Sequence, residues 1–133
     1  MAVKRRIRGK TICKLQGVLF LILAIAGLVS QRFLGMHLTL LHTVVHFLTA
    51  GIALYLGFAG TPEAARTFCV IGGAVYVLLV LLGFLAPNIL ATVIGHATPV
   101  TARELMPDNI VHIILGIIFF LGTSRSASVR PAR

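Results

Sequence analysis

Four apolar stretches take up most of this chain, at about residues 15–29, 39–58, 68–85 and 110–121. A helix rises about 1.5 Å per residue, so about 20 apolar residues cross a hydrocarbon core of about 30 Å. The first three stretches approach that length, and the fourth does so if its helix begins near Leu105 and includes Pro107, Asp108 and Asn109. Only 11% of the 133 residues are charged, whereas a soluble domain has about a quarter. We therefore expect a single all-α domain that is integral to a membrane.

The sequence matches itself in register, which indicates an internal duplication. An offset of 66 pairs Val45-His46 with Val111-His112, and an offset of 56 aligns residues 10–31 with 66–87. The pairs at the offset of 56 are Lys10–Arg66, Thr11–Thr67, Cys13–Cys69, Gly17–Gly73, Phe20–Tyr76, Leu23–Leu79 and Gly27–Gly83. Membrane helices associate where small residues permit close approach. These matches predict a four-helix bundle of two repeated transmembrane hairpins, at about residues 10–58 and 66–123.

Basic residues predict the orientation. Ten Lys and Arg residues lie in the N-terminal segment, the middle connection and the C-terminal tail, whereas only Arg32 and Arg103 lie in the other two connections. Positive residues concentrate on the cytoplasmic side, so we expect both termini in the cytoplasm and the protein in the cell (inner) membrane. The net charge of +9 is then a topology signal, and nucleic acid is not an expected partner. The basic tail 1–9 precedes the first hairpin, and the polar tail 124–133 is predicted to be disordered.

The start of the chain also resembles a signal peptide, with Ala24-Ile25-Ala26 before Gly27 as a possible cleavage site. The match of residues 10–31 to an internal stretch favours a retained first helix. Cys13 and Cys69 occupy equivalent positions in a reducing compartment, where a structural disulfide is not expected. Two cysteines also do not complete a tetrahedral metal site.

Polar residues follow one face of the second and fourth helices. The second helix carries His42 and His46 four residues apart, and the fourth carries Asp108, Asn109 and His112. Tyr76, on the third helix, is a possible further hydrogen-bond donor. Polar residues inside a bilayer are costly and usually face the bundle interior. We therefore expect an interhelical cluster in the outer half of the bilayer.

Three interpretations of this cluster stay open. A His–Asp or His–Asn hydrogen bond would fasten helices together at about 0.6–2 kcal/mol. Alternatively, His42, His46 and His112 would bind a cofactor: a bis-histidine haem, a chlorin or a transition metal. A proton-linked transport component is the third interpretation, although no polar relay continues into the cytoplasmic half. No nucleophile elbow, zinc-protease motif or phosphate loop is present, so the sequence does not predict an enzyme.

The segments that carry these residues resemble a known family. The segments 41–46, 73–79 and 108–112, with Gly116, are similar to small four-helix bacterial membrane proteins grouped as domain of unknown function 4383. The resemblance covers about residues 15–122, and Thr43 and Ile110 depart from the family's Asn and Trp. It implies the four-helix fold and marks five characteristic polar positions, without implying an activity: His42, His46, Asp108, Asn109 and His112.

Together these observations predict a non-enzymatic accessory or interaction subunit. Its expected partners are the lipid bilayer and other membrane proteins, or further copies of itself.

Overall fold

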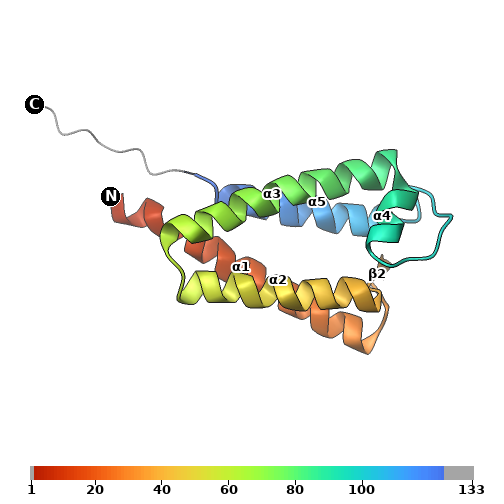
Figure 1. The fold of residues 1–133 in the computed structure, drawn as a ribbon, viewed down its shortest axis with the longest axis horizontal. Helices are drawn as coiled ribbons and strands as arrows, with labels where there is room; N and C mark the ends of the chain where they lie inside the picture. Colours follow the sequence, from red (N-terminus) through yellow and green to blue (C-terminus); the bar gives the residue numbers. More distant parts are fainter. Residues whose placement is uncertain (1, 125–133) are drawn as a thin grey trace, which may run out of the picture.

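The computed structural model describes residues 2–124, and the side chains from Arg8 to Ser124. It is all-helical apart from one short hairpin (Figure 1). The elements within these residues are α1 (Ala2–Val29), β1 (Arg32–Phe33), β2 (Met36–His37), α2 (Leu40–Phe58), α3 (Pro62–Leu85), α4 (Pro87–Val93) and α5 (Met106–Leu121). The basic segment expected as a tail is helical from Ala2 and continuous with α1. The predicted disorder of 124–133 lies outside the described residues, except for Ser124.

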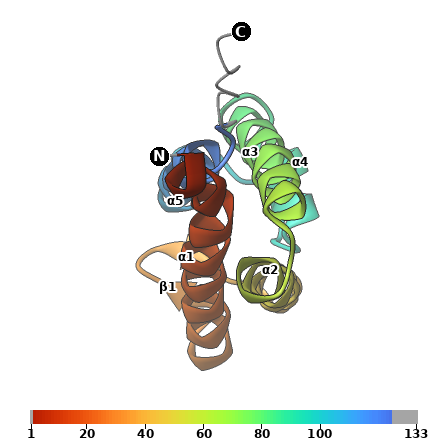
Figure 2. The same ribbon diagram turned by 90° about the vertical axis from the view of Figure 1, so that its left-hand side faces the viewer.

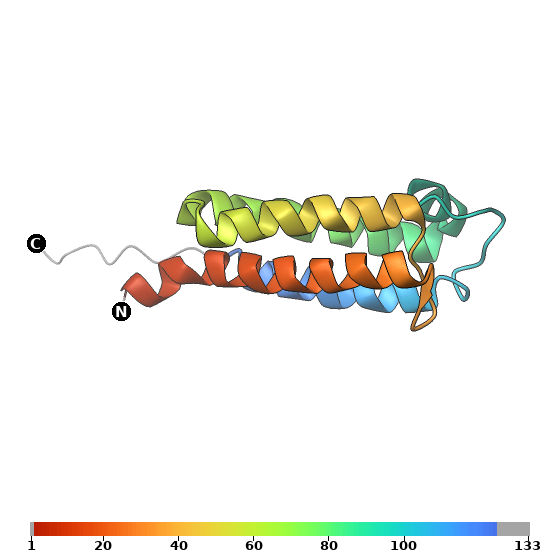
Figure 3. The same ribbon diagram turned by 90° about the horizontal axis from the view of Figure 1, so that it is seen from below.

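The helices α1, α2, α3 and α5 run alongside one another. Viewed along the molecule, α1 and α5 lie on one side and α2 and α3 on the other, an arrangement that a perpendicular view also shows (Figures 2 and 3). The packing is most extensive within two pairs, α1 with α2 and α3 with α5, and α2 and α3 contact each other far less. The start of α1, the end of α5 and the α2–α3 connection lie at one end, with the hairpin and α4 at the other (Figure 1).

Three of these helices are long and apolar enough to cross a membrane: Arg8–Val29 within α1, α2 and α3. This confirms the coarse prediction of a helical protein with helices that could span a membrane. The fourth helix, α5, has 16 residues, which corresponds to about 24 Å at the rise of an α-helix. It begins at Met106, so Pro107, Asp108 and Asn109 do lie in its first turn.

Residues with specific capping chemistry set several helix ends. Thr39 and Thr61 cap α2 and α3, each accepting a hydrogen bond through its side chain from a backbone N–H three residues on. Pro62, Pro87 and Pro107 lie in the first turns of α3, α4 and α5, where the missing N–H costs nothing. Pro87 also separates α3 from α4, because its ring disfavours a helical conformation at Ala86.

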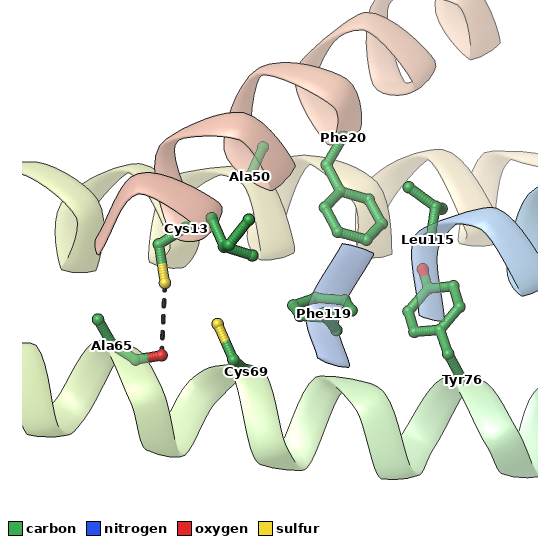
Figure 4. Close-up of a cluster of buried hydrophobic side chains, with 9 residues drawn as sticks. Cys13, Phe20, Ala50, Ala65, Cys69, Tyr76, Leu115 and Phe119 are labelled. Carbon is green, nitrogen blue, oxygen red and sulfur yellow. Dashed lines mark hydrogen bonds between the residues drawn. The ribbon is translucent and has the colours of Figure 1, made fainter. Parts of the chain in front are cut away.

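The buried core lies among α1, α2, α3 and α5 and contains aromatic and sulfur-bearing side chains (Figure 4). Two thiols contact backbone across the α1–α3 interface: Cys13 Sγ lies 3.5 Å from the Ala65 carbonyl oxygen, and Cys69 Sγ 3.9 Å from that of Gly9. Both thiols are buried and free. Phe20, in the next turns of α1, is fully buried.

Large apolar side chains lie on the outside of the molecule. Leu28, Leu48 and Leu78 are all more than half exposed, as are many other Leu, Ile, Val and Phe residues of the four long helices. Seven of the polar or charged residues, by contrast, are buried: Gln16, His42, Thr43, His46, Asp108, Asn109 and His112. An apolar outside around a polar inside is the pattern that a lipid environment favours.

Candidate functional site

A group of buried and partly buried polar side chains occupies the end of the molecule that carries the β-hairpin and α4. We call His37, His42, His46, Asp108 and His112 the polar cluster. They come from β2, α2 and α5, and Tyr76 of α3 borders them. The cluster has two parts, one in which the polar atoms are paired and one in which several are not.

Asp108 is the centre of the paired part. Its side chain is 1% exposed, and each carboxylate oxygen accepts a hydrogen bond from His37. The His37 backbone N–H donates to Oδ1 at 3.0 Å, and ring Nδ1 lies 2.9 Å from Oδ2. These bonds join the first turn of α5 to β2, and a carboxylate near a helix N-terminus is also favoured by the helix dipole. The His37 and His96 rings meet in a T-shaped arrangement, with centroids 4.2 Å apart.

His42 extends the paired part into α2. Its Nδ1 lies 3.0 Å from the His37 carbonyl oxygen. Because a carbonyl only accepts, Nδ1 carries the proton, and in the neutral ring Nε2 is left as an acceptor. One turn earlier, the Thr39 hydroxyl donates to the Ile94 carbonyl, which holds the end of α4 against the start of α2.

His46 and His112 form the unpaired part. The His42 and His46 rings are 4.3 Å apart at their centroids, and the His42 and His112 rings 6.1 Å apart. Tyr76 meets His112 edge-on at 5.5 Å. Nδ1 of His46 and Nδ1 of His112 are both buried and, among the described residues, have no hydrogen-bond partner. A buried polar atom left unpaired costs about 1–3 kcal/mol, so the fold carries a local cost here.

A cavity of about 190 Å³ lies against this unpaired part. His42, His46, His112 and Tyr76 line it, together with apolar residues of α2, α3 and α4. The apolar lining residues are Val45, Val75, Leu79, Val93 and Ile94. Asp108 does not line it and borders instead a neighbouring void of about 10 Å³.

An aromatic layer separates the cavity from the other half of the core. Phe20 lies 5.5 Å from the His46 ring, 6.0 Å from Tyr76 and 6.1 Å from Phe119. Phe20 and Phe119 are 0% and 1% exposed. The cysteine pair lies beyond this layer (Figure 4), so the polar cluster does not continue past mid-molecule.

Two buried amides lie apart from the cavity. Gln16 of α1 donates through Nε2 to the Leu115 carbonyl at 2.8 Å, which joins α1 to α5. The Asn109 side chain is fully buried, faces Gly83 of α3 and makes no side-chain hydrogen bond among the described residues. The structure thus brings His42, His46, His112 and Tyr76 to one cavity, and places Asp108 and Asn109 outside its lining.

The cluster does not fit the metal or macrocycle interpretations. Within the described residues, no group of three or more His, Cys, Asp or Glu side chains is placed to hold a metal ion. The cavity of about 190 Å³ is smaller than the range of about 300–1,000 Å³ typical of sites for drug-sized ligands. A haem or chlorin macrocycle is larger than this cavity can enclose.

Sequence reasoning did not single out three residues that matter here. His37 and His96 lie in connections, where no helical periodicity indicates which residue they meet. Gln16 carried a usable signal, because it lies on the same helical stripe as Cys13 and Phe20 near the start of an apolar stretch.

Comparison with known proteins does not add to this geometry. Searches against protein-family models, curated proteins and solved structures found no match to this chain.

Proposed function

We propose that this chain is a four-span protein of the cell membrane that acts without enzymatic activity, as an accessory or interaction subunit. In this proposal, the hydrogen bonds of the paired part of the polar cluster hold β2, α2 and α5 together at the extracytoplasmic end of the bundle. The observation that carries it is the carboxylate of Asp108, which is almost fully buried and bonded twice to His37. The proposal keeps the resemblance to the domain-of-unknown-function 4383 proteins, whose D-N-x-x-H element corresponds to residues 108–112.

Reciprocal contacts support an origin by duplication. Cys13 contacts the carbonyl of Ala65, and Cys69 contacts the carbonyl of Gly9. At the offset of 56, Cys69 corresponds to Cys13 and Ala65 corresponds to Gly9, so the two contacts are reciprocal. Two cations make equivalent contacts, each within its own hairpin. Lys10 Nζ lies 3.5 Å from the Phe58 carbonyl, and Arg66 Nε donates to the Thr123 carbonyl at 2.8 Å. The cysteine contacts, which exchange partners between the hairpins, are those expected of two units related by a twofold axis.

The cations also support the proposed orientation. Lys10 and Arg66 meet carbonyls at the C-terminal ends of α2 and α5, where a positive charge is favoured by the helix dipole. Both lie at the end of the molecule that holds the start of α1. That end is cytoplasmic in our proposal. The short helix α5 then crosses the bilayer where the bilayer is locally thinned.

Single cysteines test the orientation, because native Cys13 and Cys69 are buried. We expect an impermeant maleimide to label Arg103→Cys in intact cells, and Ser124→Cys only after permeabilisation. The unmodified chain is the control and should remain unlabelled in both conditions. Labelling of Ser124→Cys from outside would overturn the N-in/C-in arrangement.

The accessory role is tested by the size of the assembly. We expect the tagged chain, extracted in a mild detergent and cross-linked in the membrane, to migrate with a second membrane protein or with further copies of itself. A single uncross-linked chain under both conditions would contradict the role. No soluble domain is present within residues 2–124 to receive an aqueous partner.

A proton-linked transport role has less support in this geometry. A relay needs polar groups on both sides of mid-molecule, whereas the layer of Phe20, Tyr76 and Phe119 lies directly behind the histidines.

A further inference from the structure

The cavity next to the unpaired histidines has the properties of a ligand site. Its wall combines the side chains of three histidines and a tyrosine with an apolar lining, the combination that marks small-molecule sites. His46 and His112 are each 3% exposed, and their Nδ1 atoms lack partners. Nε2 of His42 is left as an acceptor because Nδ1 donates to the His37 carbonyl. These groups offer more hydrogen bonds than the protein itself uses.

The volume of the cavity limits the size of the ligand. An engineered protein cavity of about 150 Å³ binds benzene, and this cavity measures about 190 Å³. It therefore has room for one six-membered ring with one or two added oxygens.

The lining limits the charge of the ligand. The nine lining residues include no Lys, Arg, Asp or Glu, and an unpaired charge in an apolar environment is strongly disfavoured. Asp108 lies nearby, but both of its oxygens are bonded to His37. A neutral ligand that both donates and accepts hydrogen bonds therefore best matches the histidine and tyrosine side chains of the wall.

The mouth of the cavity lies on the outer surface of the helices. Val45, Val75 and Val93 are 48%, 46% and 54% exposed and come from α2, α3 and α4. In the proposed four-span arrangement this surface faces lipid, so a ligand would enter from the bilayer. The inference depends on the proposed function in this respect.

We propose that the cavity binds a neutral, lipid-soluble, hydroxyl-bearing single ring of the phenol or hydroquinone class. The ligand hydroxyl donates to Nε2 of His42 and accepts from the Tyr76 hydroxyl or a histidine N–H. The ring packs against Val45, Val75 and Leu79. An apolar groove of about 220 Å³ between α3 and α5 shares Tyr76 and His112 with the cavity, and it would accommodate part of an alkyl tail.

The test is direct binding to the full chain in lipid nanodiscs, measured by calorimetry and by the shift in melting temperature. Hydroquinone and phenol are the probes, and benzene is the matched ring without a hydroxyl. We expect saturable binding of one phenol or hydroquinone per chain, at least tenfold tighter than benzene, since benzene makes none of the hydrogen bonds of the hydroxyl group. Equal affinity for phenol and benzene, or no saturable binding of phenol, would overturn the proposal.

Variants assign the binding to this cavity. His46→Leu and His112→Leu should each weaken hydroquinone binding about tenfold, whereas His96→Ala, a histidine outside the lining, should leave it unchanged. If the leucine variants do not fold, Val75→Phe at the mouth should block binding while keeping the histidines. Unchanged binding in Val75→Phe would place the ligand elsewhere and overturn the proposal.

A decyl-substituted hydroquinone distinguishes the source of the ligand. Affinity that exceeds that of the free ring, after correction for partition into the nanodisc, indicates a membrane quinol, and equal affinity indicates a free phenolic compound. Either result supports the shared ring chemistry. The labelling of Ser124→Cys and Arg103→Cys checks the membrane arrangement separately, so failure of the binding proposal and failure of the proposed function give different results.

Discussion

The helix pairs α1–α2 and α3–α5 pack through the same kind of glycine contact, but with different side chains. In α1 a Cβ added to Gly27 would meet the Thr43 side chain, and in α3 one added to Gly83 would meet that of Asn109. In the proposed duplication these positions correspond. Both pairs therefore approach closely because a glycine makes room for a polar side chain of the partner helix.

The two pairs differ in their connections and in the first turn of the second helix. The α1–α2 connection supplies His37 from β2, whereas the α3–α5 connection supplies α4, whose end covers the cavity. His42 and Asp108, which are 66 residues apart, both bond to His37. The shared features thus maintain helix packing, and the differences create the polar cluster and its cavity.

The largest expected effect is the loss of the buried carboxylate. Asp108→Ala leaves two N–H groups of His37 unpaired, and each buried donor left without a partner costs about 1–3 kcal/mol. His42→Ala, at the corresponding position, removes a single hydrogen bond and should cost about 1–2 kcal/mol. Reversible unfolding in detergent compares the two variants. Equal losses of stability in the two variants would mean that the Asp108 carboxylate contributes no more than the single hydrogen bond of His42.

Glycine substitutions in the two pairs should come next. Gly83→Ala and Gly27→Ala each force a buried side chain to move, and overpacking costs about 1–3 kcal/mol. Gly51→Ala is the matched control, since nothing lies within 4 Å of an added Cβ there. That variant should be neutral or stabilising by up to about 1 kcal/mol. A neutral Gly83→Ala would show that Asn109 can rearrange at little cost.

Replacement of the unpaired histidines should change the stability least within the cluster. His46→Leu and His112→Leu remove buried nitrogens that have no partner, so we expect changes within about 1 kcal/mol in either direction. The same melting experiments measure this. A decrease of more than about 3 kcal/mol in the free energy of unfolding of His112→Leu would show that the His112 ring stabilises helix packing, as the helix-to-helix interpretation of the sequence expected.

The smallest effect is expected at Glu104, in the connection before α5. The backbone N–H and hydroxyl of Thr101 donate to its carboxylate at 2.7 and 2.9 Å, and these bonds lower the pKa of Glu104 below its ordinary value of 4.5. A lowered folded pKa stabilises the connection above the unfolded pKa, and this contribution is lost as the pH falls through the folded value. The protection of the Thr101 amide against hydrogen exchange, measured relative to the intrinsic exchange rate at each pH, should therefore fall as Glu104 is protonated below its ordinary pKa of 4.5, and Glu104→Gln should remove that pH dependence.

The sequence predicted those features that depend on local periodicity. The second apolar stretch, expected at 39–58, is α2 at Leu40–Phe58, and the third ends at Leu85 as expected. The buried face of α1 was also readable, because Cys13, Phe20 and Ala24 follow a helical stripe and are all 0% exposed.

The connections and the partner of Asp108 could not be predicted in the same way. Neither α4 nor the β-hairpin has a periodic pattern long enough to identify. The bond of Asp108 to His37 joins residues 71 positions apart. Helix geometry favours a partner on a neighbouring helix, such as His42 or His46, whereas the bond depends on the conformation of residues 30–39. Gly35, with a φ of +82°, helps set that turn.

The aromatic layer behind the histidines limits the route by which a molecule can reach the cavity. Phe20 and Phe119 close it toward the cysteine pair, so a neutral molecule enters and leaves by the same side. In the proposed membrane arrangement, occupancy by the proposed ligand would follow its concentration in the adjoining leaflet and would be independent of the voltage across the membrane, since no charge would move through the field. The proposal thus predicts a site that senses the composition of one leaflet and carries no flux.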